Sequence, residues 1–162
     1  MLARAMSTAS IISASMARAD SRQGLAREAG WVGAGGAVGA LARSALAWCA
    51  PSLGWPELAA TQAVNLAGAI VLGILVSALE IRGPRPRLRA FLGVGVLGSF
   101  TTFSTLVDES RSVAGVTSSG VALAYLTGSL LLGIVAFWLG ERTSKLALSR
   151  APRPHDETAN TP

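Results

Sequence analysis

Closely spaced hydroxyl side chains lie inside a stretch that is otherwise apolar and contains helix-breaking glycines. The stretch is GVLGSFTTFSTLVDES, residues 95–110, with Thr101, Thr102, Ser104 and Thr105 near its middle. Non-helical backbone in an apolar surrounding needs protein or water around it, and its freed carbonyls can coordinate a cation. In a regular helix, the same hydroxyls would simply bond back to the preceding turn. The stretch therefore predicts either a broken, cation-binding helix or a helix with local hydroxyl bonds.

Three further positions could serve an anion. The side-chain amide of Asn65, in AVNLAG, can donate to an anion or can join two helices. The ring of Phe103 has a positive edge that can face an anion. Arg43 lies inside the first apolar run, where it extends to the interface, attracts anions or serves as a structural anchor.

A further row of polar side chains is expected on the last apolar run. Tyr125 and Ser129 are four residues apart and share one face of a helix. The next position of that row is Gly133, which offers no side-chain donor. Packing with a local hydroxyl bond and a role beside an ion path explain this pair equally well.

Composition indicates an all-α membrane protein. Hydrophobic residues make up 51% of the 162 residues and charged residues only 14%, whereas soluble domains carry about 25% charged residues. Apolar runs long enough to cross a bilayer occupy about 30–50, 58–80, 89–110 and 117–140. Small residues recur in them and allow close helix packing. We expect four transmembrane helices in residues 29–142, the third broken in mid-membrane.

The two ends of the chain differ from this domain. Residues 1–28 are rich in Ser, Ala and Arg and predict a disordered leader, or sequence upstream of the true start. Residues 143–162 predict a disordered cytoplasmic tail.

Basic residues collect at one side of the expected spans. They form three clusters: Arg4, Arg18, Arg22 and Arg27; Arg82, Arg85, Arg87 and Arg89; and Arg142, Lys145, Arg150 and Arg153. The first loop has none, and the third has only Arg111. This positive-inside pattern predicts a multi-pass plasma-membrane protein with both termini in the cytoplasm. The clusters have no interleaved aromatic residues, so we expect no nucleic-acid partner.

The sequence gives little support for an enzymatic function. The chain has one cysteine, Cys49, and one histidine, His155, the latter in the polar tail. No nucleophile–base pair or cysteine-based metal site can be assembled from these residues.

Three blocks then resemble a known family. GGAVGALAR (35–43), VNLAG (64–68) and GSFTTFSTLVDE (98–109) are similar to the signature blocks of the CrcB/Fluc fluoride channels. The resemblance implies a fluoride-specific channel that lowers cytoplasmic fluoride by passive efflux. It also implies an antiparallel, dual-pore dimer in the lipid bilayer, with a structural sodium ion that is not transported at its centre.

The resemblance assigns a role to each matching position. Gly98 and Thr101 would offer backbone carbonyls to the sodium. Arg43 and Glu109 match the arginine of the first helix and the acidic residue that closes the third block. The residues of the implied fluoride pathway are Asn65, Phe103, Ser104, Thr105, Tyr125 and Ser129.

One position departs from the family pattern. Leu106 stands where a second phenylalanine is usual, so a ring contact is missing. A homodimer of antiparallel subunits needs one sequence to insert both ways, yet the charge bias favours one orientation. We therefore hypothesise a dimer with an oppositely oriented paralogue, with the homodimer as the alternative.

Two other classes remain as alternatives. A small four-helix exporter of cations or drugs would need a carboxylate within the membrane, but Glu80 and Glu109 lie at the expected span ends. A purely structural membrane protein would leave the broken third helix without a purpose.

Overall fold

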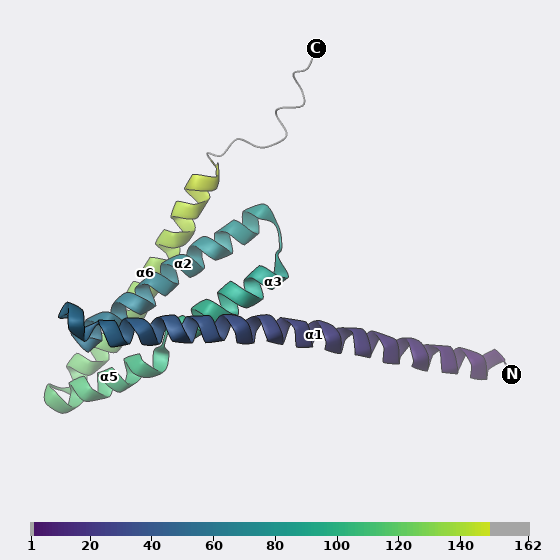
Figure 1. The fold of residues 1–162 in the computed structure, drawn as a ribbon, viewed down its shortest axis with the longest axis horizontal. Coiled ribbons are helices and arrows are strands. Elements are labelled where there is room, and N and C mark those ends of the chain that lie inside the picture. The colour runs from purple at the N-terminus through teal and green to yellow at the C-terminus, as the bar shows by residue number, and fades with distance from the viewer. Residues whose placement is uncertain (1, 150–162) are drawn as a thin grey trace, which may run out of the picture.

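The chain is helical in the part that the computed structural model describes, residues 2–149, with side chains described for residues 23–149 (Figure 1). The segments are α1 (Leu2–Cys49), the 3-10 turn η1 (Pro51–Leu53), α2 (Glu57–Arg82), α3 (Pro86–Leu88), the π-helical η2 (Arg89–Leu97), α4 (Gly98–Phe100), α5 (Phe103–Val116) and α6 (Ser119–Ser149). No strand occurs within residues 2–149, which confirms the all-α prediction for that part of the chain.

Proline and glycine set the turns between the long helices. Pro51 follows the end of α1, and Gly54 closes the turn at a φ of 70°. Gly83, at a φ of 89°, ends α2, and Pro86 starts the next helical run. Proline cannot continue a preceding helix but fits the first turn of a new one, and glycine adopts positive φ without strain.

Two pairs of parallel segments form the body of the molecule (Figure 1). In the first pair, α1 runs beside η2, so that Gly35 lies against Phe91 and Gly39 against Val96. In the second pair, α2 runs beside α6, so that Ile70 lies against Gly140 and Ile74 against Ser144. In both pairs the residue numbers rise together along the contact. Hence α1 and η2 run parallel to each other, and so do α2 and α6.

Small residues fill the interior, while large apolar residues point outward. The buried hydrophobic residues are mostly alanines, joined by Val64, Leu97 and Leu106. Large side chains such as Leu131 and Ile134 are 63% and 66% exposed. A soluble protein rarely leaves so much apolar surface open, whereas a bilayer covers it. The arrangement is that of a membrane protein.

Three helical runs within the described residues are long and apolar enough to cross a bilayer: 57–82, 86–116 and 119–149. They cover the predicted spans 58–80, 89–110 and 117–140. The predicted span 30–50 lies in α1, which is not among the three. Glycines and Arg43 in this segment lower its mean hydropathy, although its helical structure was expected.

The ends of the helical body also differ from expectation. α1 begins at Leu2, within the segment 1–28 predicted as a disordered leader. Its alanines and arginines are strong helix formers, which explains a continuous helix there. At the other end α6 continues to Ser149, past the predicted boundary at residue 142. The remainder of the predicted tail, 150–162, lies outside the described residues.

Replacing Gly39 with alanine tests the contact between α1 and η2. An added Cβ would collide with the backbone of Val96, so Gly39→Ala should lower the unfolding midpoint temperature in detergent, by overpacking that costs about 1–3 kcal/mol. Gly33→Ala is the matched control, since nothing lies within 4 Å of its Cβ position. There the better helix propensity of alanine should leave the midpoint unchanged or raise it. Equal effects of the two variants would contradict the close packing.

Candidate functional site

Helical geometry stops at Thr101 and Thr102. Thr101 has φ −77° and ψ 153°, and Thr102 has φ −141° and ψ 121°, so both are extended. The helix restarts at Phe103, where the hydroxyl of Thr102 caps α5 by accepting from the amide of Thr105 at 3.2 Å. The glycine- and threonine-rich stretch thus joins two helical pieces by a short extended link.

Asn65 satisfies the backbone that this link exposes. Its Nδ2 donates to the carbonyl of Thr102 at 3.0 Å, and its Oδ1 accepts from the amide of Thr102 at 2.8 Å. A buried peptide group without partners would cost free energy, so this pair of hydrogen bonds fixes the link against α2. One of the two Nδ2 hydrogens of Asn65 takes part in this pair, which leaves the second one.

Arg43 holds the turn that precedes the link. Its Nε donates to the carbonyl of Ser99 at 3.1 Å, so α1 also reaches the segment just before the link. Arg43 is half-buried and lines a cavity of about 230 Å³ together with Thr61, Thr102, Thr105 and Glu109. Of the readings given by the sequence, this contact fits an anchor inside the protein better than an arginine that extends to the interface.

Glu109 joins three helices at the same cavity. Its Oε1 accepts from Thr61 of α2 at 2.6 Å, and its Oε2 accepts from Tyr125 of α6 at 2.8 Å. The residue lies in the middle of α5 and is half-buried, so it does not lie at a helix end as the sequence suggested. Charge-assisted hydrogen bonds of this kind are stronger than neutral ones and fix the angle between α2, α5 and α6.

The hydroxyls of the opening stretch form a local cluster. The Oγ1 of Thr102 lies 3.2 Å from the Oγ of Ser104 and 2.9 Å from the Oγ1 of Thr105. Thr101 bonds back to the carbonyl of Leu97 at 2.9 Å. Thr101 thus makes the local hydroxyl bond that the sequence allowed. Two extended residues separate the helical pieces, and binding of a cation there stays a prediction.

The other candidate residues differ in their exposure. Phe103 is 60% exposed and turns away from the interior. Tyr125 is half-buried and uses its hydroxyl hydrogen on Glu109, while Ser129, one turn further on α6, is 9% exposed. Gly133 has nothing within 4 Å of its Cβ position. Of the predicted fluoride-pathway residues, only Thr105 lines the cavity that Arg43 and Glu109 share.

Leu106 belongs to the packed interior of the chain. It is only 3% exposed, whereas Phe103, three residues earlier on α5, is open. Leucine at this position therefore fills space between the helices of its own chain.

The carbonyls of Gly98 and Thr101 suit a cation held by neutral oxygen atoms. Outside the helices' own ladders, no hydrogen bond within residues 23–149 reaches either carbonyl. Gly98 is exposed, with nothing within 4 Å of its Cβ position. The same part of the chain holds no group of three or more His, Cys, Asp and Glu residues that could hold a metal ion.

Sequence reasoning missed two contributors to the site. Thr61 donates to Glu109, and the carbonyl of Ser99 accepts from Arg43. Thr61 precedes Asn65 by four residues on α2 and therefore shares its helix face, a signal that was present in the sequence. No comparable signal marks a backbone carbonyl.

Fold and site together define a small, all-helical membrane protein with an interrupted, hydroxyl-rich segment held by two neighbouring helices. Residues 30–141 match the model of the family described as CrcB-like protein, Camphor Resistance (CrcB), and the chain belongs to this family.

Curated relatives support the same assignment. The chain is 37% identical to fluoride-specific ion channel FluC 2 of Thermobifida fusca, over 74% of this chain and 90% of the relative. It is 41% identical to fluoride-specific ion channel FluC of Phenylobacterium zucineum, over 67% and 88%. It is 42% identical to fluoride-specific ion channel FluC 1 of Lactiplantibacillus plantarum, over 68% and 93%.

Removing the amide of Asn65 tests its role in holding the link. In Asn65→Leu the amide and carbonyl of Thr102 lose their partners, so the unfolding midpoint temperature in detergent should fall, by the equivalent of about 1–3 kcal/mol. Thr127→Val is the control, because Thr127 is exposed and bonds only within its own helix and should change the midpoint little. An unchanged midpoint in Asn65→Leu would mean that the pair with Thr102 does not stabilise the fold.

Proposed function

We propose that this chain forms a fluoride-specific ion channel, not an enzyme, that lets fluoride leave the cytoplasm passively. The observation that carries the proposal is the interrupted segment at Thr101 and Thr102, fixed by Asn65 and flanked by hydroxyls, in a chain whose relatives carry the name of fluoride channels. Conduction would need no chemical step, only a path that is polar where the surrounding helices are apolar.

The proposed path replaces the water around fluoride with weak but numerous donors. Asn65 has an Nδ2 hydrogen beyond the one it gives to Thr102, and Ser104 and Thr105 add hydroxyls in the same cluster. The exposed ring of Phe103 can present its positive edge. Donors of this strength let a small anion enter and also leave, which a fully charged site would hinder.

The proposed fluoride path continues along α6 towards Glu109. Tyr125 and Ser129 lie on one face of α6, with the hydroxyl of Tyr125 now on Glu109. We propose that Arg43 attracts the anion into the shared cavity and that Glu109 serves mainly as a structural junction, since both of its oxygens accept hydrogen bonds. Tyr125 would have to turn from Glu109 to donate to fluoride.

A structural sodium ion fits the carbonyl oxygens at the link. Gly98 and Thr101 would hold it through their backbone, next to extended residues that free those oxygens. Such an ion supplies positive charge that offsets part of the cost of placing an anion in low dielectric. Within this chain, Arg43 and Asn65 keep the carbonyl-bearing segment in position.

The working assembly is proposed to be an antiparallel dimer in the plasma membrane. The parallel pairs α1–η2 and α2–α6 fit a chain that crosses four times in alternating directions, with α1 as the first crossing and both termini in the cytoplasm. The outward ring of Phe103 is available to a second subunit. The strong charge bias favours an oppositely oriented paralogue over a second copy of this chain.

The exporter of cations or drugs is the second candidate. Its support is Glu109, a half-buried carboxylate that lines a cavity instead of lying at a helix end. The hydrogen bonds from Thr61 and Tyr125 occupy both of its oxygens, which favours the channel.

Fluoride flux from liposomes tests the channel. Vesicles loaded with fluoride and containing the protein together with an oppositely oriented family member should release fluoride much faster than the same vesicles loaded with chloride release chloride. Phe103→Ile and Asn65→Asp should each reduce the flux by at least about tenfold, since the first removes a ring edge and the second places a negative charge in the path. Trp48→Ile, at an aromatic residue that is 84% exposed, is the control and should conduct normally.

Each contrary result has a distinct meaning. Normal flux in both Phe103→Ile and Asn65→Asp would reject the residue assignments. Proton-coupled efflux of an organic cation without fluoride flux would favour the exporter.

Labelling of tagged termini tests whether the second subunit is a paralogue or another copy of this chain. When this chain is expressed alone, the tags should be reached predominantly from the cytoplasmic side, because of its arginine bias, and fluoride efflux should be low. Co-expression with an oppositely oriented family member should restore efflux. Equal labelling from both sides, together with full efflux from this chain alone, would establish the homodimer instead.

A further inference from the structure

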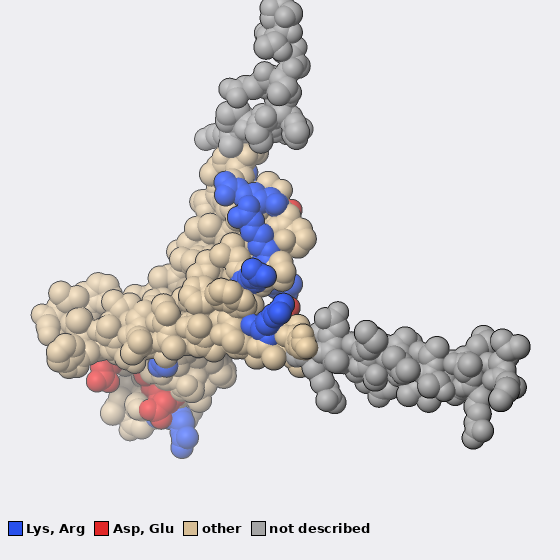
Figure 2. All heavy atoms as spheres, turned by 45° about the vertical axis from the view of Figure 1, so that its right-hand side comes forward, with Lys and Arg blue, Asp and Glu red and all other residues tan. Residues whose placement is uncertain are grey.

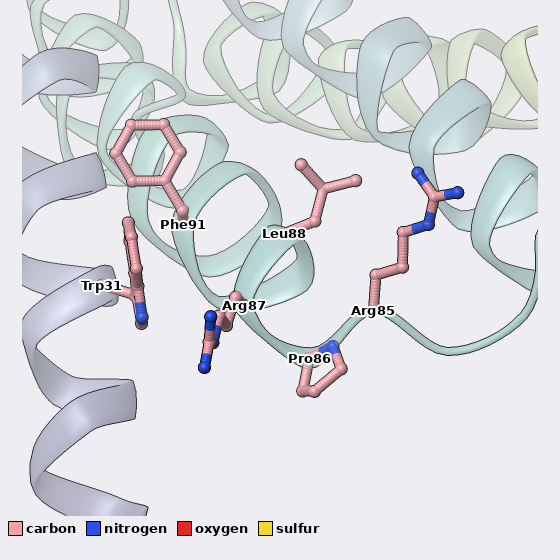
Figure 3. Close-up of a pocket in the computed structure, with 6 residues that line it drawn as sticks. All are labelled: Trp31, Arg85, Pro86, Arg87, Leu88 and Phe91. Atoms are coloured by element: carbon pink, nitrogen blue, oxygen red, sulfur yellow. The ribbon is translucent and has the colours of Figure 1, made fainter.

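We propose that the pocket between Trp31 of α1 and the α2–α3 turn binds the headgroup of an anionic phospholipid. The pocket has a volume of about 450 Å³ and is lined by Trp31, Arg85, Pro86, Arg87, Leu88 and Phe91 (Figure 3). Cavities of this size bind small ligands. The proposal rests on the membrane location of the chain and is independent of fluoride conduction.

The wall of the pocket is apolar and aromatic. Trp31 of α1 and Phe91 of η2 meet edge to face, with ring centroids 6.3 Å apart and planes at 89°. Leu88, beside Phe91, and Pro86, below the rings, continue this surface (Figure 3). Trp31 is 43% exposed, and tryptophan in this position is typical of the headgroup level of a bilayer. Such a wall suits the first carbons of an acyl chain.

The rim of the pocket is positively charged. Arg87 lies beside Trp31, and Arg85 extends on the other side of Pro86 (Figure 3). Both arginines are exposed, and among residues 23–149 neither forms an ion pair or a side-chain hydrogen bond. A guanidinium group binds a phosphate through paired N–H donors. Two arginines without an ion pair among residues 23–149, on either side of an apolar wall, therefore complement a phosphodiester that carries acyl chains.

The surroundings of the pocket strengthen its charge. Figure 2 shows Lys and Arg side chains in a column along one side of the molecule, from the far ends of α2 and α6 towards α1. Arg82 and Arg89 flank the two pocket arginines in the sequence. Basic clusters next to a membrane helix attract anionic lipids. An anionic headgroup is thus favoured over a zwitterionic one, and the apolar wall favours a lipid over a free phosphate ester.

Lipid retention by the purified full-length protein tests the site. Native mass spectrometry in detergent would compare dioleoyl phosphatidylglycerol with dioleoyl phosphatidylcholine. The protein should retain the anionic lipid more strongly, and Arg85→Ala/Arg87→Ala should weaken that retention by about tenfold. Arg82→Ala/Arg89→Ala removes the same charge from the same turn, but neither residue lines the pocket; it should weaken retention less than about twofold.

Several outcomes would overturn the proposal. Equal losses in the two double variants would show diffuse electrostatic attraction and no built site. Equal retention of the two lipids by the unmodified protein would exclude anionic selectivity. Unfolding midpoints measured without added lipid should match between the double variants, so that a folding defect is not mistaken for lost binding.

A further comparison separates a lipid from a free phosphate. Short-chain dihexanoyl phosphatidylglycerol should displace the bound dioleoyl lipid, whereas glycerol 1-phosphate at the same concentration should not. Leu88→Asn should weaken retention of the lipid severalfold, because it removes part of the apolar wall. Displacement by glycerol 1-phosphate as strong as that by the short-chain lipid would assign the pocket to free phosphate and reject the lipid.

Discussion

The structure depends on satisfying the amide and carbonyl of Thr102 in an apolar surrounding. An extended link cannot use the hydrogen bonds of a helix, and lipid offers none in their place. Asn65 supplies both a donor and an acceptor to Thr102, and Arg43 fixes the carbonyl of Ser99 one turn earlier. These contacts come from α2 and α1, so the interruption is maintained only while both helices stay packed around it.

The two parallel pairs provide that packing by keeping backbones close. Glycines at Gly35 and Gly39 admit the backbone of η2, and Gly73 and Gly140 do the same between α2 and α6. Without a hydrophobic drive between helices in lipid, dispersion over such close contacts holds them together. Glu109 then links the α2–α6 pair to α5, which ties the second half of the interrupted run to the rest of the bundle.

Sequence alone predicted most of this architecture and only part of the site. Apolar runs located α2, the third run and α6, and the glycines and threonines of residues 95–110 located the interruption. Hydropathy was a weaker guide for α1, because its glycines serve packing and not lipid contact. The pair between Asn65 and Thr102 and the junction at Glu109 depend on how helices far apart in the sequence are placed. Neither could follow from spacing along one helix.

Phe103 and Leu106 show how the direction of a side chain determines which molecules constrain its evolution. They occupy one turn of α5, yet the first faces out and the second is enclosed by its own chain. Change at Leu106 must be accommodated by neighbouring residues in the same gene. Change at Phe103 must be accommodated by whatever molecule covers the ring, so the two positions of a single motif evolve under separate sets of constraints.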